Sequence, residues 1–376
     1  MAVEAALIAC QYITTEESSP FKSCCVTPTR SGESGGKLNS VSGLRRRREE
    51  SICGHQLIEN SPSFEETRQK CLDSIVSAWN WSTLHFSSLP TWLQDNDYLK
   101  TGHRPPLSYQ GCFISWFRLH TETWNIWTHF LGALLFLYLA IRSLIFNQVP
   151  SLIHGVSIND QITINFKWDD KIVLGTFFAG AVICLGMSSI YHTLSCHSPG
   201  VCRVFSRLDY CGISLLITGS FVPWLYYGFY CERHLKLFYL FLVSILGVTT
   251  VIVALSEFFS LPKNRPIRAG VFMAFGFSGL LPAIHWLISQ DWINTESLRV
   301  SFIKLVLMGI LYVAGTTLYA LRIPERFFPG KFDVWFHSHQ LFHFFVLCAA
   351  FVHYLGINEI AIYRVANQGC SCTPSY

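Results

Sequence analysis

The sequence His339-Gln340-Leu341-Phe342-His343 opens the last long apolar segment of the chain, residues 336–357. In a helix, side chains four residues apart lie on the same face, so His339 and His343 are close enough to bind one ion. Ionisable groups at membrane depth are costly and mark functional sites. The stretch therefore predicts a membrane-spanning helix whose two histidines are candidate metal ligands.

The rest of the chain repeats the membrane signal. It is 51% hydrophobic and 14% charged, whereas soluble domains carry about 25% charged residues. A helix of about 20 apolar residues crosses a bilayer core. Seven segments near this length occur at 123–146, 171–192, 209–230, 235–257, 269–290, 301–321 and 336–357. We therefore predict an all-α membrane protein, a seven-transmembrane helix bundle, in preference to a soluble helical protein.

The charges at the helix ends predict the orientation. Lys and Arg are slightly more numerous on the side of the N-terminus, and the basic run 45–48 adds to that side. By the positive-inside rule, the N-terminus is cytosolic and the C-terminus extracellular. This orientation is opposite to that of a G-protein-coupled receptor, so seven helices alone do not indicate that class.

Composition divides the chain into four parts. Residues 1–70, rich in Ser, Glu, Thr, Gly and Arg, predict a disordered cytosolic tail. Residues 71–122 are an amphipathic juxtamembrane segment that could contact the membrane surface. The bundle occupies 123–357, and 358–376 form an extracellular C-terminal tail. The single basic run does not indicate nucleic-acid binding.

The 14 cysteines lack zinc-finger spacing. Those inside apolar segments behave as small hydrophobic residues. In the predicted topology Cys231, Cys370 and Cys372 face outward, where a disulfide is possible.

Two further candidate ligands belong to the same membrane face as His339 and His343. The second span ends at His192, and the third begins near Asp209. An even-numbered span ends on the face where odd-numbered spans begin, so all four side chains can occupy one layer of the bundle. This argument depends on the number of spans and holds for either orientation.

The residue types of this layer suit Zn²⁺. Three neutral imidazoles bind zinc at about 2.0–2.1 Å, and three protein ligands with an open position are typical of catalytic zinc. Such zinc lowers the pKa of bound water to about 7. Asp209 could ligate the metal or act as general base on that water. Ser188, four residues before His192 on the same helical face, could donate a hydrogen bond to the water or to an oxyanion.

Other histidines in the apolar segments have a simpler interpretation. A single membrane histidine more often makes a helix–helix hydrogen bond than a metal bond, and we predict this for His129, His285 and His353. His337 lies two residues before His339 and therefore points to a different face of the helix.

Several longer stretches carry a family resemblance. They are DNDYL at 95–99, HTETWNIWTH at 120–129, FSRLDY at 205–210, GSFVPWLYY at 219–227, RAGVF at 268–272 and RIPERFFPGKFD at 322–333. Through them the chain resembles the progestin and adipoQ receptor family, most closely the adiponectin receptors, over about 89–357. The resemblance implies a plasma-membrane receptor in which His192, His339 and His343 hold zinc, with Asp209 and Ser188 around its bound water.

The resemblance also implies an extracellular adiponectin-like hormone as the signal, with effects on lipid and glucose metabolism, and a cytosolic adaptor that binds the N-terminal region. It implies kinship with membrane hydrolases that include alkaline ceramidases, which cleave the amide of ceramide to sphingosine and a fatty acid. The acid would lie in the bundle, and Arg268 and Tyr210 match positions that contact its carboxylate, as suits a cation and a phenol. From the residues alone, Arg268 is equally consistent with an anchor at the lipid headgroups.

Three functions therefore stay open. The first is a hormone receptor whose zinc site hydrolyses ceramide, and the second is a signalling receptor in which zinc is structural. The third is a transporter or channel, which requires polar residues along a continuous path through the bundle. The polar residues instead concentrate in one layer, so we rank this function last.

Overall fold

The structure is a computed structural model that describes residues 69, 73, 80–149, 162–290 and 292–366. Almost all of the predicted tail 1–70, residues 71–72 and 74–79 of the predicted segment 71–122, and residues 367–376 lie outside the described residues. The chain divides into two compact units, Met1–Asn80 and Trp81–Tyr376. The membrane-length helices found among the described residues all belong to the second unit.

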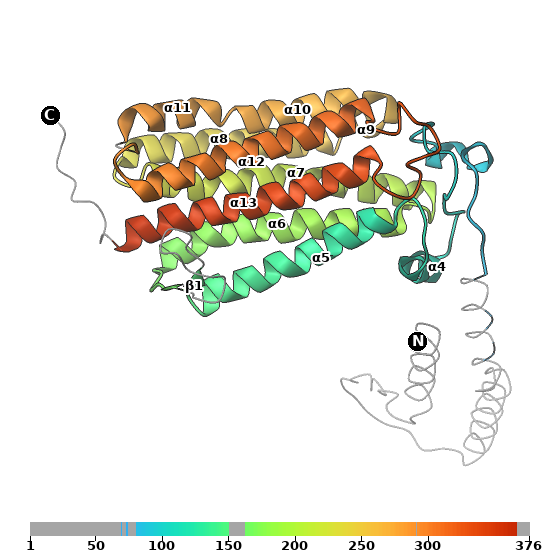
Figure 1. The fold of residues 1–376 in the computed structure, drawn as a ribbon, viewed down its shortest axis with the longest axis horizontal. Helices are drawn as coiled ribbons and strands as arrows, with labels where there is room; N and C mark the ends of the chain where they lie inside the picture. Colours follow the sequence, from blue (N-terminus) through green and yellow to red (C-terminus); the bar gives the residue numbers. More distant parts are fainter. Residues whose placement is uncertain (1–68, 70–72, 74–79, 150–161, 291, 367–376) are drawn as a thin grey trace, which may run out of the picture. The chain divides into compact units, whose positions relative to one another are not determined.

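Helices dominate this unit, and Figure 1 shows the long ones side by side in a bundle. The short elements are η1 (Phe86–Ser88), η2 (Thr91–Leu93), α4 (Tyr109–Ile114), η3 (Ser115–Phe117), α9 (Glu257–Ser260) and η5 (Pro262–Asn264). The long elements are α5 (Thr123–Ala140) with its continuation η4 (Ile141–Ile145), α6 (Trp168–Leu194), α7 (Pro199–Gly228), α8 (Arg233–Ala254), α10 (Arg265–Phe277), α11 (Leu280–Ser289), α12 (Glu296–Leu321) and α13 (Ser338–Ala366).

Seven candidate membrane spans occur in the described part of the chain, which confirms the predicted seven-helix bundle. The fifth span consists of α10 and α11, which the prediction treated as one uninterrupted helix. The all-α prediction also lacked a small antiparallel pair, β1 (Gln148–Val149) with β2 (Ile162–Thr163), in the connection between η4 and α6.

The third span begins earlier than predicted. Ser198 caps α7 by accepting a hydrogen bond from the backbone N–H of Val201, and Pro199 occupies the first helical position, where proline is favourable. Asp209 therefore lies inside α7, well past its first turn, and the expectation that it opens the helix was wrong. The last helix is also longer than predicted, because α13 continues past 357 to Ala366.

A close contact between α6 and α7 sets the level of two site residues. Gly212 faces the backbone of Cys184 so closely that a Cβ on Gly212 would lie 2.8 Å from the Cys184 Cα. Small residues allow membrane helices to approach in this way. Ser188 follows Cys184 by one turn, and Asp209 precedes Gly212 by almost one turn. The antiparallel contact therefore brings Ser188 and Asp209 to the same depth in the bundle.

The segment before α5 closes the end of the bundle where α6 ends. The Arg104 guanidinium donates hydrogen bonds to the backbone carbonyls of His192 and Thr193, which lie at the helix end where carbonyls lack helical partners. Asp95 pairs with Arg265 at the start of α10, with an Oδ2–Nη2 distance of 2.5 Å. These contacts hold the last turn of α6 and the start of α10 against the juxtamembrane segment.

The start of α13 is fixed by a carboxylate from the preceding loop. Glu325 accepts hydrogen bonds from the backbone N–H of Ser338 (2.7 Å) and from the Ser338 hydroxyl. Asn96 Nδ2 donates to the same carboxylate at 3.1 Å. Because these bonds determine where the helix begins, they also determine which way His339 and His343 point.

Candidate metal centre

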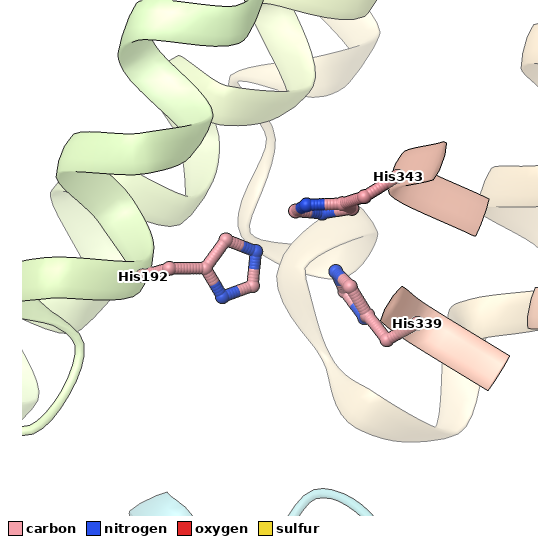
Figure 2. Close-up of side chains that lie close together, drawn as sticks. All are labelled: His192, His339 and His343. Atoms are coloured by element: carbon pink, nitrogen blue, oxygen red, sulfur yellow. The ribbon is translucent and has the colours of Figure 1, made fainter. Parts of the chain in front are cut away.

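Three histidines from two helices converge at one end of the bundle. His192 lies in the last turn of α6, and His339 and His343 lie in the first two turns of α13. Figure 2 shows the three rings pointing toward one another. One ligand nitrogen from each ring lies within 4.8 Å of the others, so this group could hold a metal ion.

Hydrogen bonds at the far side of two rings leave the inner nitrogens available. His192 Nδ1 donates to Glu122 Oε2 at 2.6 Å, and the buried His192 Nε2 has no hydrogen-bond partner. His343 Nδ1 donates to the backbone carbonyl of Asn125 at 3.2 Å. Metal-ligating histidines characteristically donate their second N–H to a carboxylate or a carbonyl. His192 and His343 therefore fit a metal ion by an observation independent of their spacing.

Glu122 is the site residue that the sequence analysis missed. Burial raises the pKa of its carboxyl, but the nearby His192 and Arg104 outweigh burial, and the pKa lies well below its ordinary value. Asn125 Nδ2 donates to the same carboxylate at 2.7 Å. Glu122, Asn125 and His129 are spaced three and four residues apart, on one helical face at the start of the first span. That spacing was the signal that could have found Glu122.

Ser188 and Asp209 lie beside the histidines. The Asp209 side chain is near both Ser188 and His192. Asp209 is 8% exposed and Ser188 is 2% exposed. Ser188 Oγ is buried and makes no direct hydrogen bond to any described residue. Both side chains line an internal cavity, so they are available to a polar group that enters it.

The cavity extends from the histidines into the apolar part of the bundle. Its volume is about 790 Å³, within the range of about 300–1,000 Å³ that is typical of small-molecule sites. Ser188, Asp209, His339 and His343 form its polar end, and mainly apolar residues of α7, α10, α11 and α12 form the remaining wall. The geometry therefore suits a ligand with a polar group attached to a hydrocarbon chain.

Arg268 and Tyr210 also line this cavity. Arg268 Nη1 donates to the carbonyls of Phe259 (2.7 Å) and Leu261 (2.8 Å), and the guanidinium carbon lies 4.9 Å from the centre of the Tyr210 ring. Arg268 Nε is buried without a hydrogen-bond partner among the described residues. The structure thus places Arg268 inside the bundle, where it is 4% exposed.

The remaining histidines divide into two kinds. The predicted helix–helix hydrogen bonds are confirmed for His285, which contacts the Tyr239 hydroxyl at 2.8 Å, and for His353, which donates to the Ser220 carbonyl at 2.9 Å. His129 differs, because neither of its buried ring nitrogens has a partner in the described part of the chain. Its ring instead stacks on the ring of His343, with centroids 3.5 Å apart.

His337 follows its prediction. Its Nε2 contacts the backbone carbonyl of Thr121 at 3.0 Å, and it does not belong to the three-histidine group.

The fold and the site define a multi-pass membrane protein whose three clustered histidines could hold a metal ion at the polar end of an apolar cavity. The sequence profile of the family described as haemolysin-III related matches residues 117–354. The chain belongs to this family, which includes the progestin and adipoQ receptors.

Three relatives illustrate the range of the family. The adiponectin receptor protein of Drosophila melanogaster is 55% identical over 78% of this chain and 62% of its own length. The progestin and adipoQ receptor-like protein 1 of Caenorhabditis elegans is 50% identical over 77% of this chain and 63% of its own length. Heptahelical transmembrane protein 4 of Arabidopsis thaliana is 34% identical over 73% and 87% of the two chains. This chain therefore spans less than two thirds of the length of the first two relatives.

Proposed function

We propose that this chain is a zinc-dependent lipid amidase built into a membrane receptor. The observation that carries the proposal is the cavity, which has Ser188, Asp209 and two of the three clustered histidines, His339 and His343, at one end and an apolar wall at the other. A ceramide-like lipid has the matching chemistry, because it carries an amide next to long hydrocarbon chains.

Zinc would be held by His192, His339 and His343, since imidazole nitrogens are common ligands of catalytic zinc. When bound, the metal would act as a Lewis acid and activate water for attack on the amide. Glu122 would hold His192 with Nε2 directed into the site, through the hydrogen bond at Nδ1.

The neighbouring side chains would handle the proton and the substrate. Asp209 would accept a proton from the attacking water as general base. The Ser188 hydroxyl would donate a hydrogen bond to the developing oxyanion on the amide carbonyl. Arg268 Nε and the Tyr210 hydroxyl would bind the carboxylate of the fatty-acid product, as a charge-assisted contact.

We propose further that the protein lies in the plasma membrane with a cytosolic N-terminus and an extracellular C-terminus. Cys231, which follows α7 at the end remote from the histidines, is disulfide-bonded, and disulfides persist in oxidising compartments. This bond supports an outward position for the end of the bundle where α13 also ends.

We propose a receptor role in this orientation. The Drosophila relative is named an adiponectin receptor, which supports an extracellular adiponectin-like hormone as the signal. The proposed output is the regulation of lipid and glucose metabolism. The N-terminal region would then face cytosolic adaptors and inner-leaflet lipids.

In a second candidate function the protein binds the metal but does not catalyse hydrolysis. The histidines come from α6 and α13, which are far apart in sequence, so a metal would join two helices of the bundle. Metal binding contributes directly to folding stability. In this alternative zinc is structural, and the receptor signals without cleaving any lipid.

Ceramide hydrolysis by purified full-length protein distinguishes the two functions. We expect turnover by the wild type and a loss of at least about 100-fold in His339→Ala, because removing a ligand exceeds the effect of removing a residue that orients one. His285→Ala is the matched control, since His285 contacts Tyr239 and lies outside the metal group. Equal turnover in wild type and His339→Ala would contradict the catalytic proposal.

A further inference from the structure

Two cysteines lie in contact just beyond the end of α6 that carries His192. Cys112 lies in α4, and Cys196 lies in the turn between α6 and α7. Their Sγ atoms are 3.5 Å apart, and the residues are 0% and 2% exposed respectively. A disulfide has an S–S bond of about 2.05 Å, so a small shift of the two side chains would bring the sulfurs to bonding distance.

The backbones on either side of this pair are already tied together. Leu107 N–H donates to the Cys196 carbonyl at 3.1 Å, and His197 Nδ1 donates to the Leu107 carbonyl at 2.9 Å. The rings of Tyr109 and His197 are in contact, with centroids 3.8 Å apart. These contacts keep α4 next to the turn that follows His192, so the thiols remain within reach of each other.

The two thiols differ in chemical character. Their mutual hydrogen bond and the nearby Arg104 hold the pKa of the Cys196 thiol below its ordinary value, against the effect of burial. The same hydrogen bond, together with burial, raises the pKa of the Cys112 thiol. Thiolates are the nucleophilic form of cysteine. Cys196 therefore has the character of an attacking sulfur and Cys112 that of a resolving thiol.

We propose that Cys112 and Cys196 are a redox modification site, a dithiol that hydrogen peroxide oxidises to an intramolecular disulfide. Both sulfurs are buried, so the oxidant must be small. Hydrogen peroxide is small and uncharged and can reach them, whereas a bulky charged peptide disulfide such as oxidised glutathione cannot. The disulfide joins α4 to the turn four residues beyond His192, and so fixes the juxtamembrane segment to the helix that carries this metal-site histidine.

The reaction balances with one peroxide. The Cys196 thiolate attacks a peroxide oxygen and breaks the O–O bond, giving a sulfenic acid and a hydroxide that takes up a proton as water. The Cys112 sulfur then attacks the Cys196 sulfur and displaces the hydroxyl group, which leaves as a second water with the Cys112 proton. Two thiols and one peroxide thus give one disulfide and two waters, and a dithiol reductant reverses the change.

The test uses reduced full-length protein in detergent, treated with hydrogen peroxide, then denatured in N-ethylmaleimide and digested without reductant. Mass spectrometry should detect a Cys112–Cys196 cross-linked peptide that disappears with dithiothreitol, while Cys184, a buried free thiol, stays labelled with maleimide. In Cys112→Ser, dimedone should trap a sulfenic acid on Cys196. In Cys196→Ser, Cys112 should remain a free thiol.

The wild-type measurement decides the proposal even if a variant fails to fold. Complete maleimide labelling of both cysteines after peroxide treatment would overturn it, and so would a cross-link from either cysteine to a different partner. An equal yield of the disulfide with oxidised glutathione would overturn the assignment of peroxide as the oxidant. Cys348→Ser, which removes a free thiol on α13, should behave as wild type.

Discussion

The helices that hold the candidate site differ in burial from α10, α11 and α12, which form much of the cavity wall. In their apolar segments, 50%, 56% and 67% of the residues of α6, α7 and α13 are buried, against 17% in the α10–α11 span and 17% in α12. The metal-site histidines, Ser188 and Asp209 all belong to the first group. A largely buried set of helices thus positions the polar groups, and a more exposed set, together with α7, lines the rest of the cavity.

Glycine shows the physical origin of this difference. A Cβ on Gly219 of α7 would lie 2.5 Å from the backbone carbonyl oxygen of Thr176 in α6, so the two helices touch through their backbones. A Cβ on Gly270 of α10 would have no neighbour within 4 Å. Other side chains of the wall helices, such as Leu281 and Ile288, are exposed, which suits contact with lipid.

The largest effect should come from the carboxylate of Asp209 in α7. We expect Asp209→Asn to retain zinc and to lower ceramide hydrolysis by roughly 10²–10⁴-fold, because the amide cannot act as a general base. Turnover and zinc content of the purified variant are the measurements. Asp169→Asn, at an exposed position near the start of α6, is the control. Unchanged turnover would contradict the role of Asp209, and loss of zinc would make it a metal ligand.

A smaller effect should come from the residue that orients His192. We expect Glu122→Gln to weaken zinc binding by roughly 10–100-fold, as typically follows when a hydrogen-bond partner of a metal ligand is lost. Competition with a chelator of known affinity measures this change. The control is Glu257→Gln, which removes an ion pair with Arg207 at the protein surface. Equal zinc affinity in wild type and Glu122→Gln would show that Glu122 does not position the ligand.

The smallest effects are expected from substitutions at Gly219 and Gly270, whose surroundings differ. Gly219→Ala should lower the free energy of unfolding by about 1–3 kcal/mol through overpacking, whereas Gly270→Ala should change it by less than about 0.5 kcal/mol. Denaturant titration of both variants in the same detergent gives the two values. Similar values for the two substitutions would mean that the contact of Gly219 with α6 is no closer than the surroundings of Gly270 in α10.

The bundle was predictable from the sequence because lipid imposes both a length and a composition on each span. The errors occur where a span contains polar residues. The first turns of α7 include Arg203 and Arg207, which the apolar pattern excluded, although Ser198-Pro199 is a recognisable helix start. In α13, Asn358 looked like the end of a span but is 1% exposed, so the helix continues.

The site was predictable to the extent that topology fixes it. The span count places His192, His339 and His343 on one face, and the structure brings them together. Glu122 could not be assigned from that count, because its contact with His192 depends on how the segment before α5 folds against the end of α6. The stacking of His129 on His343 depends in the same way on the rotation of α5 against α13.

Metal analysis of detergent-purified protein tests the central claim most directly. The account predicts about one zinc per chain in the wild type and none in His343→Ala, while His285→Ala retains it. A wild-type protein without zinc, or equal zinc in wild type and His343→Ala, would contradict the account.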